Sequence, residues 1–216
     1  MVVKKVLFDQ FKHALRIFLS KDDLGQDKAF DLLKSSLDDE FMIIRRRIFL
    51  LLSFLYDTQA IMGAELKLLS GIKRQIGLAL ELLDVTLSKE LKRYIFLLID
   101  ENIPLEKRIN DLKTLLNLNN MSRDERLREI ITDTKKWWLS WTCACGIYAV
   151  ALLGIRELVG AIESALGITD QPVRETAVWA LHKLDPQIYC KYSAEFLKDL
   201  NPQVSELALR LKSNNI

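Results

Sequence analysis

The sequence predicts an all-α protein, an α–α superhelix (solenoid) of about eleven or twelve helices in about five or six pairs. Turn-forming residues are scarce, with 8 Gly and 4 Pro among 216 residues, whereas sandwiches and barrels need them at every strand end. Apolar residues recur at steps of three and four instead of alternating, which favours helices over strands. Similar segments also return about every 30 residues, a spacing typical of stacked helix pairs.

The N-terminal segment predicts three helices. Apolar side chains over 3–19 fall on one helical face, and a second helix is expected over 24–37. A carboxylate at Asp38 or Asp39 can accept the free N–H groups of a first turn, so a third helix is expected from there to about Tyr56.

The middle of the chain predicts four more helices. One is expected over about 65–86, and Ser88 has the position of a cap for the next, which ends near residue 100. Pro104 fits the start of another helix, because the first helical N–H has no partner in any case. Ser122 and Glu125 have the spacing of a capping box.

The last third is the most regular. A long helix is expected over about 135–153 and a shorter one to Leu166. Three further starts each combine an Asp or Asn cap with a nearby proline. These are Asp170 with Pro172, Asp185 with Pro186, and Asn201 with Pro202.

One of these segments resembles the HEAT-repeat family. The pattern Asp-x-Pro-Val-Arg-x-x-Ala-x-x-Ala-Leu occurs here as Asp170, Pro172, Val173, Arg174, Ala177, Ala180 and Leu181. The copy that begins at Asn201 keeps Pro202, Val204 and Glu206, but Ser205 stands where arginine is typical. Copies before residue 140 lack the proline, so the HEAT assignment of the first half rests on periodicity alone.

A narrower resemblance covers residues 72–182. The runs at 80–84, 97–100 and 141–148 are similar to the helical-repeat region attached to bacterial transporters of the nucleotide-translocase type, within the major-facilitator class. This resemblance implies a cytosolic scaffold or regulatory appendage of a membrane protein. It implies no catalytic residue.

We expect residues 1–216 to form a single solenoid domain, with N-terminal helices over 1–57, irregular repeats over 58–134 and regular repeats over 135–216. The last helix would lack the second helix of its repeat, which leaves Val204, Leu207 and Leu211 thinly covered. We therefore expect the chain to be a piece of a longer protein, or to continue against a partner.

Charge and cysteine usage point to the cytoplasm, with the cytoplasmic face of a membrane as the narrower alternative. The formal net charge is +2, which counts against a dedicated nucleic-acid binder. The three cysteines are sparse and lack paired spacings, as is typical of reduced thiols. The first residues mix charges throughout and lack a signal-peptide cleavage site.

Residues 137–155 carry no charge and are long enough to span a membrane. Their three tryptophans, two glycines and hydroxyl side chains lower the mean hydropathy, and small residues suit close helix packing. A buried core helix is the preferred interpretation, and a membrane span is the alternative.

No pattern predicts catalysis, a cofactor or a metal. Cys143 and Cys145 point to different sides of a helix, which favours core packing over a shared metal. Cys190 and His182 are separated by a turn, so we expect a core cysteine and a surface histidine. His13 lies between basic residues and is expected to be exposed.

The first functional hypothesis is a non-enzymatic protein-interaction scaffold. Solenoids bind proteins or peptides, including other domains of the same polypeptide, on a concave surface built from successive helices. We expect an acidic or mixed-charge partner to contact a ridge made of Lys89, Lys92, Arg93, Asn110 and Lys113.

The alternative is a HEAT-like DNA glycosylase or a nucleic-acid-binding protein. Trp137, Trp141 and Tyr148 would share a helix face one turn after Asp133, similar to HEAT-like glycosylases of alkylated bases. Such an enzyme needs a carboxylate to stabilise the sugar cation and basic residues on the flanking phosphates. The small net charge counts against it. Phycobilin lyases share the fold, but no residue here singles them out.

Overall fold

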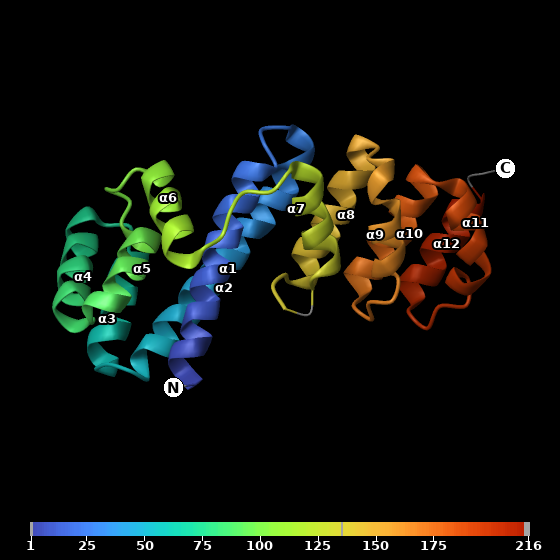
Figure 1. Cartoon of the computed structure of the whole chain (residues 1–216). Helices are drawn as coiled ribbons and strands as arrows, with labels where there is room; N and C mark the ends of the chain where they lie inside the picture. Colours follow the sequence, from blue (N-terminus) through green and yellow to red (C-terminus); the bar gives the residue numbers. More distant parts are fainter. Residues whose placement is uncertain (1, 135, 214–216) are drawn as a thin grey trace. The chain divides into compact units, whose positions relative to one another are not determined.

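The computed structural model describes residues 2–134 and 136–213, and this part of the chain is all-α (Figure 1). It contains twelve α-helices, two short 3-10 helices and no strand. In chain order they are α1 (Val2–Asp23), η1 (Lys28–Phe30), α2 (Asp31–Ser53), α3 (Thr58–Leu69), α4 (Lys73–Thr86), α5 (Lys89–Ile99), α6 (Leu105–Leu116), α7 (Arg123–Thr132), α8 (Ser140–Leu153), η2 (Arg156–Leu158), α9 (Val159–Ala165), α10 (Gln171–Leu184), α11 (Pro186–Phe196) and α12 (Pro202–Ser213). The predicted fold class is confirmed.

The chain forms two compact units. The first consists of residues 1–20 and 39–120, and the second of residues 21–38 and 121–216. Helices α1 and α2 therefore contribute residues to both units. The single solenoid domain over 1–216, with its three subdivisions, stays a prediction.

In the first unit, helices that follow one another in the chain pack as neighbours: α3 with α4, α4 with α5, and α5 with α6. Aromatic rings join α1 to α5, where Phe11 stacks on Tyr94 with ring centroids 5.1 Å apart. Arg108 of α6 donates hydrogen bonds to the carbonyl oxygens of Leu97 and Leu98, at 2.9 and 3.0 Å. These bonds satisfy carbonyls at the end of α5 that have no helical partner.

In the second unit, α8, α10 and α12 form a row in which each helix packs on the next. Helix α10 also packs against α9 and α11, while α7 contacts both α8 and α9. Apolar side chains fill the row, since Ile147, Val173, Ala177 and Val204 are all fully buried. The second unit thus has the neighbour-to-neighbour packing that a repeat architecture requires.

The uncharged stretch forms the centre of this row. Helix α8 buries most of its circumference, including both cysteines. A side-chain Cβ at Gly146 would lie 3.0 Å from Cγ2 of Ile130, so α7 and α8 approach closely at this point. The core-helix interpretation is therefore confirmed for α8, and none of the described helices has both the length and the low charge needed to cross a membrane.

A buried ionic cluster fixes the start of α7. Nε of Arg126 lies 2.9 Å from Oδ2 of Asp23, and both side chains are only 1% exposed. Arg126 also pairs with Glu129, and Oδ1 of Asp23 accepts the backbone N–H of Met121 at 3.3 Å. The predicted capping box between Ser122 and Glu125 is present beside this cluster.

Three boundaries in the first half differ from the prediction. Residues 31–53 form one helix, because Asp38 and Asp39 take exposed positions within α2 and no Gly or Pro interrupts it. The helix predicted over 65–86 is two helices, separated at Gly71, whose φ of +68° is a conformation that favours glycine. Helix α3 starts earlier than expected because Asp57 accepts the N–H of Ala60.

The starts predicted in the last third are confirmed: α10 begins at Gln171 beside Pro172, α11 at Pro186 and α12 at Pro202. The long helix expected over 135–153 begins only at Ser140, and residue 135 lies outside the described residues. Val204 is buried rather than thinly covered.

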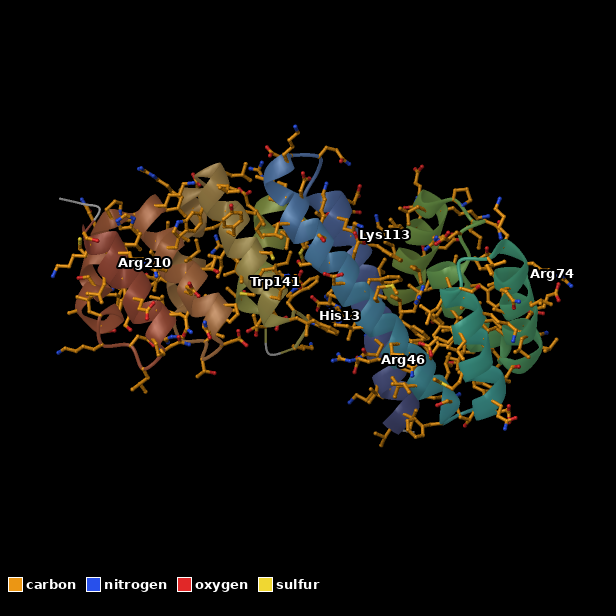
Figure 2. All side chains as sticks on the ribbon, turned by 180° about the vertical axis from the view of Figure 1, so that it is seen from behind. His13, Arg46, Arg74, Lys113, Trp141 and Arg210 are labelled. Carbon is orange, nitrogen blue, oxygen red and sulfur yellow. The ribbon has the colours of Figure 1, made fainter. Side chains whose placement is uncertain are left out.

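Two residues, His13 and Cys190, have the opposite solvent exposure to the one predicted. His13 is buried, with Nε2 3.0 Å from Oε1 of the buried Glu40, because α1 packs on more of its circumference than one apolar face (Figure 2). Cys190 is exposed on α11, whereas we expected a core cysteine. The apolar contacts of α11 are made instead by the buried Tyr189 and Phe196.

Candidate interaction surfaces

The five residues of the predicted ridge lie on α5 and α6 of the first unit. Lys89, Arg93 and Asn110 are exposed, while Lys92 and Lys113 are half-buried. Two of the cations have partners of their own: Nζ of Lys92 lies 2.8 Å from Oδ1 of Asp84, and Nζ of Lys113 donates to Oδ1 of Asn120 at 2.7 Å. The Asp84 carboxylate offsets the charge of Lys92, whereas the neutral amide of Asn120 leaves Lys113 positively charged.

Of these five residues, Arg93 lines a groove. This groove lies between α5 and α6 and has a volume of about 410 Å³. Its other lining residues are Phe96, Leu97, Asp111, Thr114 and Leu115. Because a guanidinium and the carboxylate of Asp111 both line an otherwise mostly apolar groove, the α5–α6 groove fits a mixed-charge segment better than an acidic one.

A second groove lies along the row of helices in the second unit. Tyr148 of α8 and Trp179 of α10 stack, with ring centroids 5.2 Å apart and planes inclined by 23°. Glu175 and Thr176 of α10 and Leu207 of α12 complete the lining, and the volume is about 210 Å³. We call this site the aromatic groove.

The aromatic groove carries charge of both signs at its edge. Nζ of Lys183 lies 5.3 Å from the ring centroid of Trp179, within the range of a cation–π contact. Glu175 supplies a carboxylate on the same helix, two turns towards the N-terminus. The groove therefore combines two partly exposed aromatic rings with an anion and a cation.

Sequence reasoning did not identify this site, although a signal for it was present. Ala177, Ala180 and Leu181 of the HEAT-like pattern are all buried. A residue at position 179 on the same helix must point away from that buried face, which is unusual for a tryptophan unless another ring covers it. Tyr148 stacks on Trp179, whereas the sequence places it on a face with Trp137 and Trp141.

Trp137, Trp141 and Tyr148 do not share one helix face as predicted, because α8 begins only at Ser140. Trp137 and Trp138 precede α8 and are buried, at 8% and 2% exposure, whereas Trp141 within α8 is 51% exposed (Figure 2). Asp133 is the C-cap of α7, and its backbone carbonyl accepts the N–H of Trp137. The predicted residues are thus divided between the end of α7, a turn and α8.

The cysteines differ sharply in environment. Burial raises the pKa of the Cys143 thiol to about 12, and burial also raises the pKa of Cys145. Sγ of Cys143 donates to the carbonyl oxygen of Ile131 at 3.3 Å, as a core thiol does. No group of three or more His, Cys, Asp or Glu that could hold a metal occurs among residues 2–134 and 136–213.

Comparison of the chain with protein-family models, with curated proteins and with solved structures found no match. The HEAT and transporter resemblances therefore remain predictions from the residues quoted above.

Proposed function

We propose that this chain is a non-enzymatic protein-interaction module, a HEAT-like solenoid that binds a peptide or protein segment in the aromatic groove. The observation that carries the proposal is the stack of Tyr148 on Trp179, which remains partly exposed between α8 and α10. Both rings belong to helices that pack directly on one another, so they are held on α8 and α10 and not on a loop.

The composition of the groove supports this choice. Trp and Tyr are enriched among the residues that contribute most to protein interfaces, because they bury a large area and keep one polar atom for a hydrogen bond. The open groove is small for a metabolite site, since such sites usually enclose most of their ligand. Glu175 and Lys183 would set the register of a mixed-charge segment.

Affinity capture from the cells that produce the chain tests the proposal. Thr176→Arg places a long charged side chain in the groove, on a helix surface that tolerates it, and Trp179→Ala removes the larger ring. Ser164→Arg is the matched control, since Ser164 is exposed on α9 and does not line the groove. Thermal unfolding verifies that each variant is folded.

We expect the control to retain the partners of the parent chain and both groove variants to lose the same subset. The interaction function at this groove is refuted if folded Thr176→Arg and Trp179→Ala retain every partner. The double variant Lys92→Glu/Arg93→Glu tests the predicted ridge separately, because it reverses charge only in the first unit.

The transporter-appendage form is a narrower version of this proposal. A reading frame in which a block of membrane spans adjoins the chain would support it, and a frame without one would reduce the proposal to a free-standing module.

The nucleic-acid alternative has lost support, because two of the three tryptophans near Asp133 are buried. Duplex-DNA binding at low salt, where counterion release favours association most, is its direct test.

A further inference from the structure

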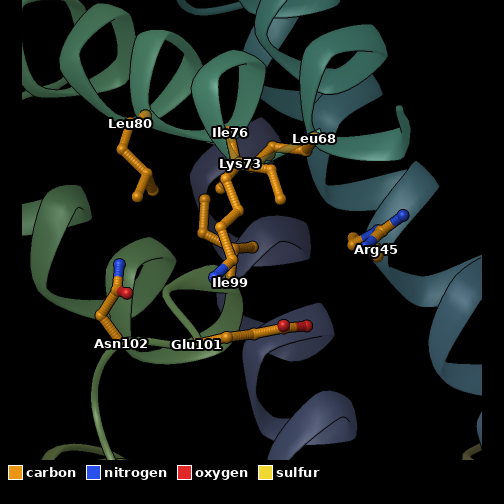
Figure 3. Close-up of a pocket in the computed structure, with 9 residues that line it drawn as sticks. Arg45, Leu68, Lys73, Ile76, Leu80, Ile99, Glu101 and Asn102 are labelled. Carbon is orange, nitrogen blue, oxygen red and sulfur yellow. The ribbon is translucent and has the colours of Figure 1, made fainter. Parts of the chain in front are cut away.

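The first unit contains a partly enclosed cavity of about 290 Å³ between α2, α4 and the segment that follows α5 (Figure 3). Four aliphatic side chains line it: Leu68, Ile76, Leu80 and Ile99. Its polar residues are Arg45, Lys73, Glu101 and Asn102. The cavity lacks aromatic lining, so it differs in chemistry from the aromatic groove.

Arg45 places a half-buried positive charge at this cavity. Burial lowers the pKa of its guanidinium, and the carboxylates of Glu65 and Glu101 oppose that shift. Its neighbour Arg46 forms the ion pair with Glu65, and no carboxylate among the described residues lies within 4.0 Å of the Arg45 nitrogens. A half-buried cation without a close counter-ion is costly unless an anion from solution can reach it.

Lys73 brings a second positive charge to the same cavity. It is the first residue of α4, and the N-cap residue Ile72 offers no side-chain acceptor to the free N–H groups of the first turn. Figure 3 shows the Lys73 side chain extending across the cavity towards Ile99. An anion in the cavity would meet this ammonium group and the positive end of the α4 dipole.

The opposite wall is polar and fixed in place. Glu101 projects its carboxylate towards the Arg45 side of the cavity (Figure 3). Oδ1 of Asp100 accepts the N–H of Asn102 at 3.0 Å, and the bonds of Arg108 to the end of α5 anchor the preceding residues. Two cations and one carboxylate leave the cavity one positive charge in excess.

We propose that this cavity binds a small aliphatic monocarboxylate, with the carboxylate between Arg45 and Lys73 and the alkyl chain against Ile76, Leu80 and Ile99. The charge excess matches a single anion, and the aliphatic lining matches an alkyl chain. Such a ligand is either a free short-chain acid or the carboxyl-terminal leucine-like residue of a peptide, since both present the same two groups.

Titration with hexanoate, followed by the methyl NMR signals of the isoleucine and leucine residues, tests the site directly. We expect shifts at Ile76, Leu80 and Ile99, and none with hexanol, which lacks the charge. Arg45→Gln should weaken hexanoate binding about tenfold, because a hydrogen bond to a charged group is removed. Arg47→Gln is the matched control, since Arg47 is exposed on the same helix and does not line the cavity.

A second variant, Gly77→Leu, tests the same cavity if the Arg45→Gln protein does not fold. Gly77 lines the cavity, and a Cβ added there meets no atom within 4 Å. Gly77→Leu should therefore occupy space in the cavity and abolish binding, while it improves the helix propensity of α4.

N-acetyl-leucine, which imitates a peptide carboxyl terminus, identifies the source of the natural ligand. Tighter binding than hexanoate indicates a peptide, and weaker binding indicates a free acid.

Three results would overturn the proposal. They are the absence of shifts at Ile76, Leu80 and Ile99 with both acids, equal binding of hexanol and hexanoate, or undiminished binding by folded Gly77→Leu. None of these results bears on the aromatic groove, which belongs to the second unit.

Discussion

The cavity of the first unit and the aromatic groove of the second are both lined by helices, yet they suit different ligands. The cavity is lined by aliphatic side chains and by Arg45, a half-buried cation. The groove is open, and two stacked rings form its wall. The two sites differ in the side chains at the edges of their helix faces. These side chains contribute little to the core, and they determine which ligand each surface can bind.

The largest expected effect concerns the ion cluster on which the second unit depends. Arg126→Ala leaves the carboxylate of Asp23 buried without its cation, so we expect a loss of about 3–5 kcal/mol in the free energy of unfolding. Denaturant titration measures it. The double variant Arg126→Met/Asp23→Leu should regain part of that loss, and a double variant as unstable as the single one would contradict this explanation.

A smaller effect compares one glycine from each unit. Gly146→Val forces a side chain against Ile130 and should cost about 1–3 kcal/mol through overpacking. Gly77→Ala enters open space inside a helix and should stabilise the protein by about 0.5–1 kcal/mol. Thermal unfolding of both variants checks the opposite signs, and equal signs would show that the α7–α8 contact is not tight.

The capping box should contribute less. Ser122→Ala is expected to cost about 1 kcal/mol. The hydrogen bonds from Ser122 lower the pKa of Glu125 from its ordinary value of 4.5, so their stabilisation is present above that value and disappears as the pH falls through the lowered pKa. Unfolding measured at neutral and at acidic pH should therefore show a smaller effect of the substitution in acid.

The smallest expected effect is a difference in the reactivity of the cysteine thiols, which leaves the free energy of unfolding unchanged. At mildly alkaline pH an alkylating reagent should modify Cys190 and spare Cys143 and Cys145, because burial raises the pKa of both core thiols. Mass spectrometry counts the modified residues. Rapid modification of Cys143 without denaturant would show that α8 is less well packed than described.

The fold class and the last third could be predicted because their signals are local. Asp or Asn beside proline marks a helix start through the geometry of two or three residues, and all three such starts were found. No proline occurs before residue 104, so the first helices lack such marks. Two consecutive carboxylates at 38–39 fit a helix start and an exposed helix surface equally well, and only tertiary packing selected the second.

The candidate sites were harder to predict because they depend on contacts between distant residues. Tyr148 and Trp179 are separated by about one repeat, and only the packing of α8 on α10 brings them together. Arg45 and Glu101 line one cavity for the same kind of reason. In the predicted ridge, Lys92 pairs with Asp84 of the preceding helix, because charge patterns along one helix do not reveal the partners that neighbouring helices supply.

Oxidative footprinting of Trp179 and Tyr148 is the most direct test of the interaction function. The rate of side-chain oxidation is compared between the purified chain and the chain in an extract of the cells that produce it, with the exposed Phe54 as the internal reference. We predict that both groove residues react more slowly in the extract while Phe54 reacts at the same rate, because a partner covers the groove. Equal rates for all three residues would contradict the assignment of the aromatic groove as an interaction site.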